Sequence, residues 1–484
     1  MLLILINHKY ENEMQTISQL FFPGEKFAFV YDFMTEEMPD GYVIYSEVSE
    51  LCICFKLYKD KVLIGESNNN PYSYKSMHNP LSQPSYFSIR RAFALDLFIL
   101  LKKHIGAFTP WGSLTGIRPS KLVREWLTVG FDDEVITKTL KDIYLCDENK
   151  AKLAVKVAHA ENKLKPMVLM DNNAIGVYVS IPFCPSRCFY CSFNTAHKPP
   201  SETLMISYTN AVLGEILEKA ALAKDLNSPV SSIYIGGGTP TFLNEILLER
   251  ILSAVVEAFY KTGLEFTVEA GRPETLSNKK LKLLKKYGVN RIAVNAQTLN
   301  NKTLNEIGRA HTAEDFINAY KSAREVGFST INTDLIAGLP GETANDMEKN
   351  METLSELKPE NITIHTLAIK RASILNVKGN LQIGNSSFAK ITEDMLSIAS
   401  KTCSSLGLIP YYLYRQKNMI GMFENIGYSK AGHECLYNVG MMAEIQTILG
   451  IGAGAVTKYV NDDKISRDFN VKNPEIYINR RITI

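Results

Sequence analysis

From about residue 175 to residue 370, short apolar, β-rich runs alternate with longer segments in which apolar residues recur at helical spacing. Such runs predict strands, and segments such as 207–223 and 244–260 predict amphipathic helices. Because strands that alternate with helices form right-handed crossovers, the pattern predicts a parallel sheet of the α/β class. Six units predict an open, partial (β/α)6 barrel. The six runs are "GVYVSI" (176–181), "SSIYIG" (231–236), "EFTVEA" (265–270), "RIAVNA" (291–296), "INTDLIA" (331–337) and "NITIHTL" (361–367).

Each predicted strand brings polar or metal-binding residues to its carboxyl end. The first strand leads into a loop with three cysteines, and the second leads into "GGGTPT" (236–241). The later strands end near Glu269, Gln297, Asp334 and "HTLAIKR" (365–371). In barrels and open α/β sheets, ligands bind at the carboxyl ends of the strands. The sequence therefore predicts a ligand site along one edge of the sheet.

The rest of the chain predicts two further domains around a barrel domain at 171–384. Residues 1–170 are β-rich at first and become helical after about residue 86, which predicts an extra N-terminal α+β accessory domain. Within it, Pro119 in "WGSLTGIRPSKLV" is expected in the first turn of a helix, where proline is favoured. Residues 385–484 predict a C-terminal helical or mixed domain that covers the substrate site, beginning with a helix near 386–406.

Composition and charge exclude several classes of protein. With 45% hydrophobic and 21% charged residues in 484, the chain is typical of a globular protein with a substantial core. Its net charge of +2 gives no drive toward nucleic acid, and no apolar stretch is long enough to span a membrane. The first residues do not have the pattern of a signal peptide, and eight cysteines are too few for a secreted disulfide framework. We therefore expect a reduced, cytoplasmic protein whose clustered thiols are ligands.

Three cysteines, Cys184, Cys188 and Cys191, stand at C-x3-C-x2-C spacing after the first strand. A [4Fe–4S] cluster is normally held by four thiolates, so three would leave one iron with an open position. A zinc site would need a fourth ligand, for which His197 is available in sequence. A disulfide is the least favoured alternative, since an odd number of thiols leaves one unpaired. The strand before the loop and the "GGGTP" turn after the next strand favour the iron–sulfur interpretation.

The cysteine loop, its place after the first strand and the "GGGTP" turn resemble the radical S-adenosylmethionine (radical SAM) superfamily. In that superfamily the open iron binds S-adenosylmethionine, and one electron cleaves it to methionine and a 5′-deoxyadenosyl radical. The barrel region further resembles the oxygen-independent coproporphyrinogen III oxidase group, and segments outside it resemble the HemZ-type coproporphyrinogen dehydrogenases of that group. The barrel motifs are "VYVSIPFCPSRCFYC", "SIYIGGGTPTFL", "VEAGRPETL", "LNEIGRAHT" and "INTDLIAGLPGET"; the outer segments are "WGSLTGIRPSKLV", "PYYLYRQKNM" and "GIGAGA".

The resemblance implies a set of site residues at matching positions. The cluster ligands would be Cys184, Cys188 and Cys191. Glu269 would accept hydrogen bonds from the cofactor, and Arg309 would pair with a carboxylate. No residue is assigned a catalytic role. The implied contacts to S-adenosylmethionine are Tyr178, Tyr190, Gly237, Gly238, Thr239, Glu269, Gln297, Arg309, Asp334 and Ala368.

For activity, the resemblance implies oxidative decarboxylation of coproporphyrinogen III to protoporphyrinogen IX in haem biosynthesis. Its partners would be a tetrapyrrole substrate, an electron donor and an electron acceptor, and no nucleic acid. Phe193 stands where the oxidases carry a further cysteine, a departure that instead resembles the haem-chaperone branch of the group. The alternatives are therefore a haem-binding chaperone without oxidase activity and a radical methyltransferase with another substrate.

The segment "YYLYRQKN" (411–418) has two interpretations. Its tyrosines could stack on a flat tetrapyrrole while Arg415 and Lys417 bind the carboxylates. Alternatively, it is a half-buried strand with solvated charges. The five cysteines outside the loop, Cys52, Cys54, Cys146, Cys403 and Cys435, are expected to be small buried hydrophobic residues.

Overall fold

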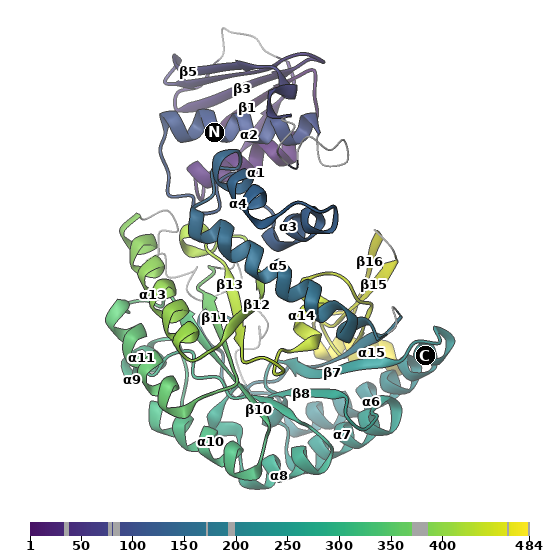
Figure 1. Ribbon diagram of the computed structural model, residues 1–484. Coiled ribbons are helices and arrows are strands. Elements are labelled where there is room, and N and C mark those ends of the chain that lie inside the picture. Colours follow the sequence, from purple (N-terminus) through teal and green to yellow (C-terminus); the bar gives the residue numbers. More distant parts are fainter. Residues whose placement is uncertain are drawn as a thin grey trace. The chain divides into compact units, whose positions relative to one another are not determined.

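The computed structural model describes residues 1–32, 38–75, 80, 88–170, 173–191, 199–369, 386–461 and 464–482 (Figure 1). The chain forms two compact units. The first unit contains residues 1–156 with the described parts of two later segments, 386–390 and 415–423, and the second contains the remaining described residues. The expected domain boundaries at 170/171 and 384/385 therefore do not coincide with the boundaries of these units.

The second unit is built on a sheet of strand order β12-β13-β11-β10-β9-β8-β7-β6-β14-β15-β16. Its six central strands pair in parallel, each with the next along the chain. Helices separate them in sequence, so the predicted α/β class and its six strand–helix units are confirmed. The central strands are β6 (Ile175–Ile181), β7 (Val230–Gly237), β8 (Glu265–Glu269), β9 (Arg291–Ala293), β10 (Thr330–Ala337) and β11 (Asn361–Thr366).

β9 is shorter than the predicted strand at 291–296. Its chain keeps pairing with β10 in an irregular way, because Val294 N donates to Asn332 O at 2.9 Å and Gln297 N donates to Asp334 O at 2.8 Å. Gln297 has φ 68°, in the left-handed region that non-glycine residues rarely adopt. This distortion ends the regular strand and fixes Gln297 against the carboxyl half of β10.

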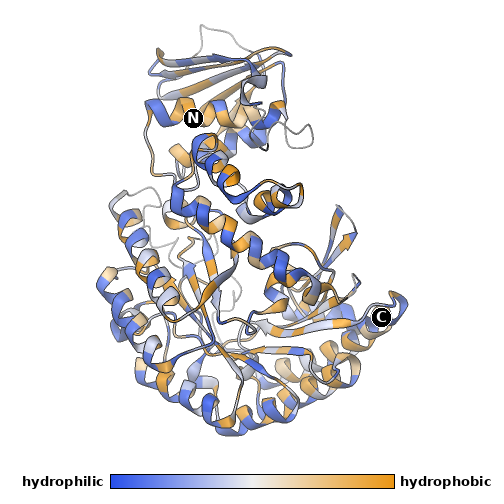
Figure 2. Ribbon diagram, in the orientation of Figure 1, coloured by the Kyte–Doolittle hydropathy of each residue, from blue (hydrophilic) through white to orange (hydrophobic). Residues whose placement is uncertain are grey.

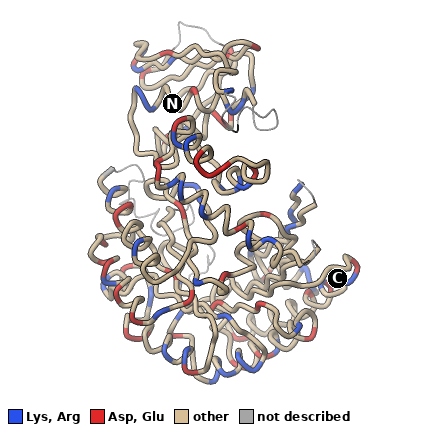
Figure 3. The backbone as a smooth tube through the Cα atoms, in the orientation of Figure 1, with Lys and Arg blue, Asp and Glu red and all other residues tan. Residues whose placement is uncertain are grey.

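The helices of the second unit pack on the sheet with their apolar faces, and Figure 2 shows apolar and polar residues alternating around them. Their starts follow local capping: Ser201 accepts from Leu204 N, and Thr312 forms a capping box with Asp315. Figure 3 shows Lys and Arg interspersed with Asp and Glu along the outer helices. The helices are α6 (Glu202–Asp225), α7 (Glu245–Phe259), α8 (Asn278–Lys286), α9 (Asn301–Glu306), α10 (Ala313–Val326) and α11 (Ala344–Leu357).

Segments from the C-terminal part of the chain extend this sheet at both sides. β12 (Ile409–Tyr414) and β13 (Asn425–Ser429) form an antiparallel pair, and β13 is antiparallel to β11. β14 (Ile448–Ile451) pairs in parallel with β6, followed by antiparallel β15 (Val456–Asn461) and β16 (Lys464–Phe469). The associated helices are α13 (Ser386–Ser405), α14 (Leu436–Met442) and α15 (Pro474–Ile482).

The first unit has its own sheet, of order β2-β1-β3-β4-β5, and is an α+β structure as predicted. A core of buried aromatic and aliphatic side chains joins the sheet to α1 and α2. Proline stands at the first turn of α3, as expected. Its strands are β1 (Leu2–Ile6), β2 (Ala28–Val30), β3 (Tyr42–Val48), β4 (Ile53–Lys59) and β5 (Val62–Asn69); its helices are α1 (Glu11–Phe21), α2 (Ile89–His104), α3 (Pro119–Thr128), α4 (Asp133–Asp142) and the first part of α5 (Glu148–Leu169).

The five cysteines outside the loop differ in burial. Cys146, Cys403 and Cys435 are buried, but Cys52 and Cys54 are half-exposed, so the expected burial is wrong for those two. They alternate along the chain with the core-facing residues of β4 and so point to the opposite face of the sheet. Within the described ranges, no helix has both the length and the apolar character needed to cross a membrane.

Candidate cofactor site at the carboxyl edge of the parallel sheet

The loop after β6 that carries the three cysteines is held on one side by the turn after β7. Gly238 N donates to Ile181 O, and Thr239 N donates to Phe183 O, both at 2.7 Å. A Cβ on Gly238 would lie 2.6 Å from Phe183 O and 3.0 Å from Cys184 Sγ, so only glycine fits there. Thr239 Oγ1 lies 3.4 Å from Cys184 Sγ. The "GGGTP" turn therefore fixes the first cysteine.

The same loop is held on another side by the segment after α9. Phe189 N donates to Ile307 O at 2.9 Å, and Ser186 Oγ donates to Gly308 O at 3.0 Å. The buried Arg309 donates from Nη2 to the Tyr190 hydroxyl at 3.4 Å. The predicted residues Tyr190 and Arg309 are thus in contact.

The other terminal nitrogen of the Arg309 guanidinium bonds to the protein backbone. Its Nη1 donates to Gly271 O and to Asn295 O, each at 3.0 Å. These bonds join the loops after β8 and β9 beneath the cysteine loop. The carboxylate partner expected for Arg309 stays a prediction.

A second buried arginine, Arg272 in the loop after β8, contacts the middle cysteine. Its Nη1 donates to Cys188 Sγ at 2.9 Å, and its Nη2 donates to Ser186 Oγ at 2.6 Å. Its Nε donates to Glu274 Oε1 at 2.8 Å. We call the three cysteines with Arg272 and Arg309 the thiol region.

The chemistry of the thiol region fits an iron–sulfur cluster. Burial raises the pKa of the Cys184 thiol to about 11, and the neighbouring cysteines add to this. Metal ligation requires the thiolate, so binding here would release a proton. Among the described residues, no three His, Cys, Asp or Glu side chains are grouped as ligands of a single metal ion. Three thiols on one fixed loop, with arginine donors beside them, fit three corners of a [4Fe–4S] cube.

Glu269 ends β8 and accepts hydrogen bonds from two groups on β7. Tyr234 donates its hydroxyl to Oε1 at 2.6 Å, and Gly237 N donates to Oε2 at 3.3 Å. Burial raises the pKa of Glu269 to about 7, and the charge of Asp334 acts in the same direction. The two hydrogen bonds lower it but do not offset burial. A cationic ligand would restore the ionised form.

Asp334, on β10, has more polar partners. Burial acts to raise its pKa, but His365 at 3.5 Å and the hydrogen bonds from Asn332 and Thr363 bring it below its ordinary value. Asn332 Nδ2 donates to Asp334 Oδ1 at 2.7 Å. Asp334 therefore remains ionised over the ordinary pH range. We call Glu269, Asp334, Tyr234 and His365 the carboxylate region.

Aromatic rings lie next to the carboxylate region. Tyr178 of β6 and Tyr234 of β7 both stack on Tyr437 of α14, with ring centroids 5.9 Å and 4.5 Å apart. Tyr411 and Tyr412 of β12 pack in the same cluster. The C-terminal segment thus supplies rings beside two barrel strands.

Comparison with known proteins identifies the family of this chain. The protein-family model described as "Radical SAM superfamily" matches residues 178–354. Over 393 residues the chain is 38% identical to the oxygen-independent coproporphyrinogen-III oxidase-like protein HemZ of Bacillus subtilis (strain 168), which covers 79% of this chain and 76% of that protein. The chain belongs to the radical SAM superfamily. The resemblance stated from the motifs is confirmed.

Other relatives place this radical SAM chain in the family of HemN, HemZ and HemW. It is 32% identical over 286 residues to the heme chaperone HemW of Bacillus subtilis, a match that covers 57% of this chain and 69% of that protein. Among solved structures it is similar to coproporphyrinogen III oxidase (HemN) from Escherichia coli, with a TM-score of 0.51 and 22% identity. That likeness covers 66% of this chain and 72% of that one, and it shows the fold alone.

The structure of this radical SAM chain links most of the predicted residues in two contact networks, the thiol region and the carboxylate region. Gln297 joins the second through its backbone bond to Asp334 O, and Ala368 lies two residues beyond the end of β11. Their roles toward S-adenosylmethionine stay predictions. His197 and Phe193 lie outside the described residues.

Sequence reasoning missed five residues that the contacts single out. Four of them belong to motifs already quoted, and their places near strand ends could have marked them: Tyr234, Arg272, Glu274 and His365. Tyr437 comes from α14 and has no such signal.

The segment 411–418 follows the strand interpretation in part. Tyr411 and Tyr412 are buried in β12. Arg415 is also buried, donates to Leu114 O and Met422 O, and lies over the Trp111 ring. Arg415 therefore stabilises the first unit, and its role in binding carboxylates gains no support.

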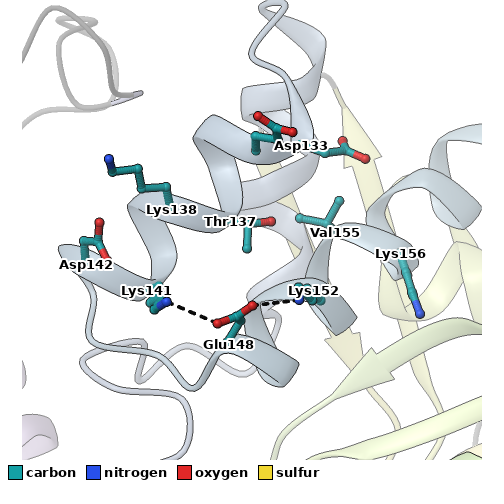
Figure 4. Close-up of a pocket in the computed structure, with 10 residues that line it drawn as sticks. Asp133, Thr137, Lys138, Lys141, Asp142, Glu148, Lys152, Val155 and Lys156 are labelled. Atoms are coloured by element: carbon teal, nitrogen blue, oxygen red, sulfur yellow. Dashed lines mark hydrogen bonds and ion pairs between the residues drawn. The ribbon is translucent and has the colours of Figure 1, made fainter.

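A separate cavity of about 630 Å³ lies in the first unit, between α4 and α5. Figure 4 shows charged side chains around it, with Glu148 paired to Lys141 at 3.1 Å and to Lys152 at 2.7 Å. None of the predicted site residues lines it.

Proposed function

We propose that this radical SAM chain carries out the oxygen-independent oxidative decarboxylation of coproporphyrinogen III to protoporphyrinogen IX. The observation that carries the proposal is the 393-residue match to HemZ. The expected barrel domain, 171–384, is much shorter than this match, so the similarity extends into the flanking segments. A shared barrel alone would support only shared radical chemistry, whereas similar flanks support a similar substrate.

In this proposal the thiol region holds a [4Fe–4S] cluster through Cys184, Cys188 and Cys191. When bound, the cluster and S-adenosylmethionine supply a 5′-deoxyadenosyl radical, which can remove hydrogen from an unactivated propionate carbon. The protein's own task is to bind, orient and shield. Gly237 and Gly238 let the turn after β7 pack against the chain at and after the end of β6, which a Cβ at either would crowd. Their backbone would contact the cofactor in this proposal.

The carboxylate region would hold the cationic parts of S-adenosylmethionine. Glu269 is kept partly neutral by burial, so a bound ammonium or sulfonium group would favour its ionised form. Asp334 is held ionised by His365, Asn332 and Thr363. The remaining predicted contacts, including Tyr178, Gln297 and Ala368, would complete the site.

The tetrapyrrole would bind beside the tyrosine cluster, with residues from 385–484 as its cover. This part of the proposal is supported by the half-buried rings of Tyr178 and Tyr234, which stack on the buried Tyr437 and make this part of the site aromatic. The reaction also needs an electron donor and an electron acceptor. A reducing, cytoplasmic setting belongs to the same proposal, because free thiols must persist there.

A haem-binding chaperone is the second candidate. It is favoured by the 32% identity to HemW and by the phenylalanine at 193 in the sequence. A radical methyltransferase would share the cluster and would be revealed by consumption of S-adenosylmethionine without decarboxylation.

An anaerobic assay separates these functions. Protein reconstituted with iron and sulfide would receive S-adenosylmethionine, dithionite and coproporphyrinogen III. We expect decarboxylated product, detected as fluorescent protoporphyrin after oxidation. Cleavage of S-adenosylmethionine with no such product would refute the oxidase, and stoichiometric haem binding in its place would support the chaperone.

A further inference from the structure

Arg272 has an arrangement that packing alone does not require. Its side chain is 3% exposed, and each of its three nitrogens donates to a different partner: Cys188 Sγ, Ser186 Oγ and Glu274 Oε1. A buried guanidinium is costly unless it is paired and hydrogen-bonded, and here one of its bonds goes to a sulfur. The charge of this arginine is therefore applied directly at one predicted cluster ligand.

The position of Arg272 is also fixed by its partner Glu274, which is itself paired with a histidine. Glu274 Oε2 lies 3.2 Å from Nδ1 of the fully buried His311 side chain. Burial acts to raise the pKa of Glu274, but His311 and the Arg272 charge lower it to about 2. Ser186, the remaining partner, is bonded onward to Gly308 O. Arg272 thus has little freedom to turn away from Cys188.

We propose that Arg272 is a positioning residue that raises the reduction potential of the cluster through its hydrogen bond to the Cys188 sulfur. The inference rests on the proposed function, since it assumes that Cys188 is a cluster ligand. Reduction adds one electron, supplied by a low-potential reductant, and no bond to Arg272 forms or breaks. The added negative charge is stabilised by the nearby guanidinium, because hydrogen bonds to the ligand sulfurs set the potential of such clusters.

Substitutions at Arg272 and at Glu274 should shift the reduction potential in opposite directions. Replacing Arg272 by Gln removes a positive charge and should lower the potential. Replacing Glu274 by Gln keeps an acceptor for Arg272 Nε but removes a negative charge, and should raise the potential. General damage to the loop would not move the two variants in opposite directions.

The experiment is a redox titration of the reconstituted full-length protein with dithionite, followed by electron paramagnetic resonance. For Arg272→Gln we expect the reduction equilibrium to shift about tenfold toward the oxidised form, about 59 mV for one electron. The potential of Arg272→Lys should lie between those of Arg272→Gln and the wild type, because lysine keeps the positive charge but lacks the planar guanidinium with its several donors. Arg250→Gln, on α7, is the matched charge control, since Arg250 pairs with Asn210 and should leave the potential unchanged.

The outcomes separate the inference from the proposed function. A wild-type protein that forms no reducible four-iron cluster would overturn both. A wild-type cluster that cleaves S-adenosylmethionine, with Arg272→Gln holding full iron at the wild-type potential, would overturn only the role of Arg272. If Arg272→Gln loses the cluster, Glu274→Gln decides: a higher potential supports the proposal, and an unchanged one refutes it.

Discussion

The thiol region and the carboxylate region lie along the carboxyl edge of one sheet, yet they carry opposite electrostatic character. The thiols are accompanied by two buried guanidinium groups, from Arg272 and Arg309. Beside Glu269 and Asp334, the described donors are a tyrosine hydroxyl, backbone, amide and hydroxyl groups, and a histidine. The first arrangement favours an anionic group such as a thiolate-bound cluster, and the second favours a cation.

Within the carboxylate region, the two acids also differ from each other. Burial raises the pKa of Glu269 to about 7, whereas His365, Asn332 and Thr363 keep the pKa of Asp334 low. The protein's own hydrogen bonds therefore do not offset the burial of Glu269, whereas the polar neighbours of Asp334 do offset its burial. This contrast is expected if Glu269 faces the cationic part of the ligand.

The largest expected effect is the loss of the thiol region's ligand set. Cys188→Ala should abolish the broad iron–sulfur absorbance of reconstituted protein and reduce bound iron to near background, because two thiols cannot hold the cube. Cys403→Ala, at a fully buried cysteine in α13, should keep both signals. A Cys188→Ala protein with the wild-type spectrum would mean that other side chains are the ligands.

The next effect tests how the thiol region is held. Gly238→Ala should destabilise the protein by about 1–3 kcal/mol, since its Cβ would meet the backbone oxygen of Phe183 at 2.6 Å. Gly214→Ala in α6 has open space around its Cβ and should instead stabilise by about 0.5–1 kcal/mol. Denaturant unfolding measures both. Equal stability of the two variants would show that the turn is not tightly packed against the loop.

The contrast between the acids predicts a pH dependence. The folded pKa of Glu269, about 7, lies above its ordinary 4.5, so the folded state binds the extra proton between these values. Stability should therefore fall as pH rises from 4.5 to 7, by about 1–3 kcal/mol, and then level off. Glu269→Gln should remove this fall in unfolding experiments at pH 5 and pH 7.5.

Asp334→Asn is the comparison variant for this pH series. Because the pKa of Asp334 is lowered, its contribution is present above its ordinary value of 3.8 and is lost only as pH falls through the lowered pKa. The variant should therefore still lose stability as pH rises from 5 to 7.5. The assignment to Glu269 fails if Glu269→Gln keeps the wild-type slope.

The central strands could be predicted from sequence because a parallel strand buried on both faces is a continuous apolar run. β6, β7, β8, β10 and β11 match their predicted ranges closely. β9 does not, because the turn at Gln297 depends on its pairing with β10, a long-range contact that local pattern cannot show.

Other features could not be predicted either, because they also depend on contacts between segments that are far apart in the sequence. β14 joins the sheet beside β6, more than 260 residues earlier in the chain, and the bond from Arg272 to Cys188 spans 84 residues. The cysteine spacing and the strand-end acids could be found because they are local. Their partners could not, since Tyr234, Arg272 and Tyr437 acquire their roles only when distant segments meet.

The smallest predicted effect refines the contrast between the acids. Tyr234→Phe removes the hydroxyl that donates to Glu269 at 2.6 Å, and should destabilise the protein by about 1 kcal/mol near neutral pH. Because that bond lowers the pKa of Glu269, its loss should move the end of the stability fall to higher pH. Tyr287→Phe, which removes the hydroxyl bonded to the exposed Glu249, is the matched control and should leave the pH profile as in wild type. If both variants behave alike, the hydrogen bond from Tyr234 does not lower the pKa of Glu269, and the role given to that bond is wrong.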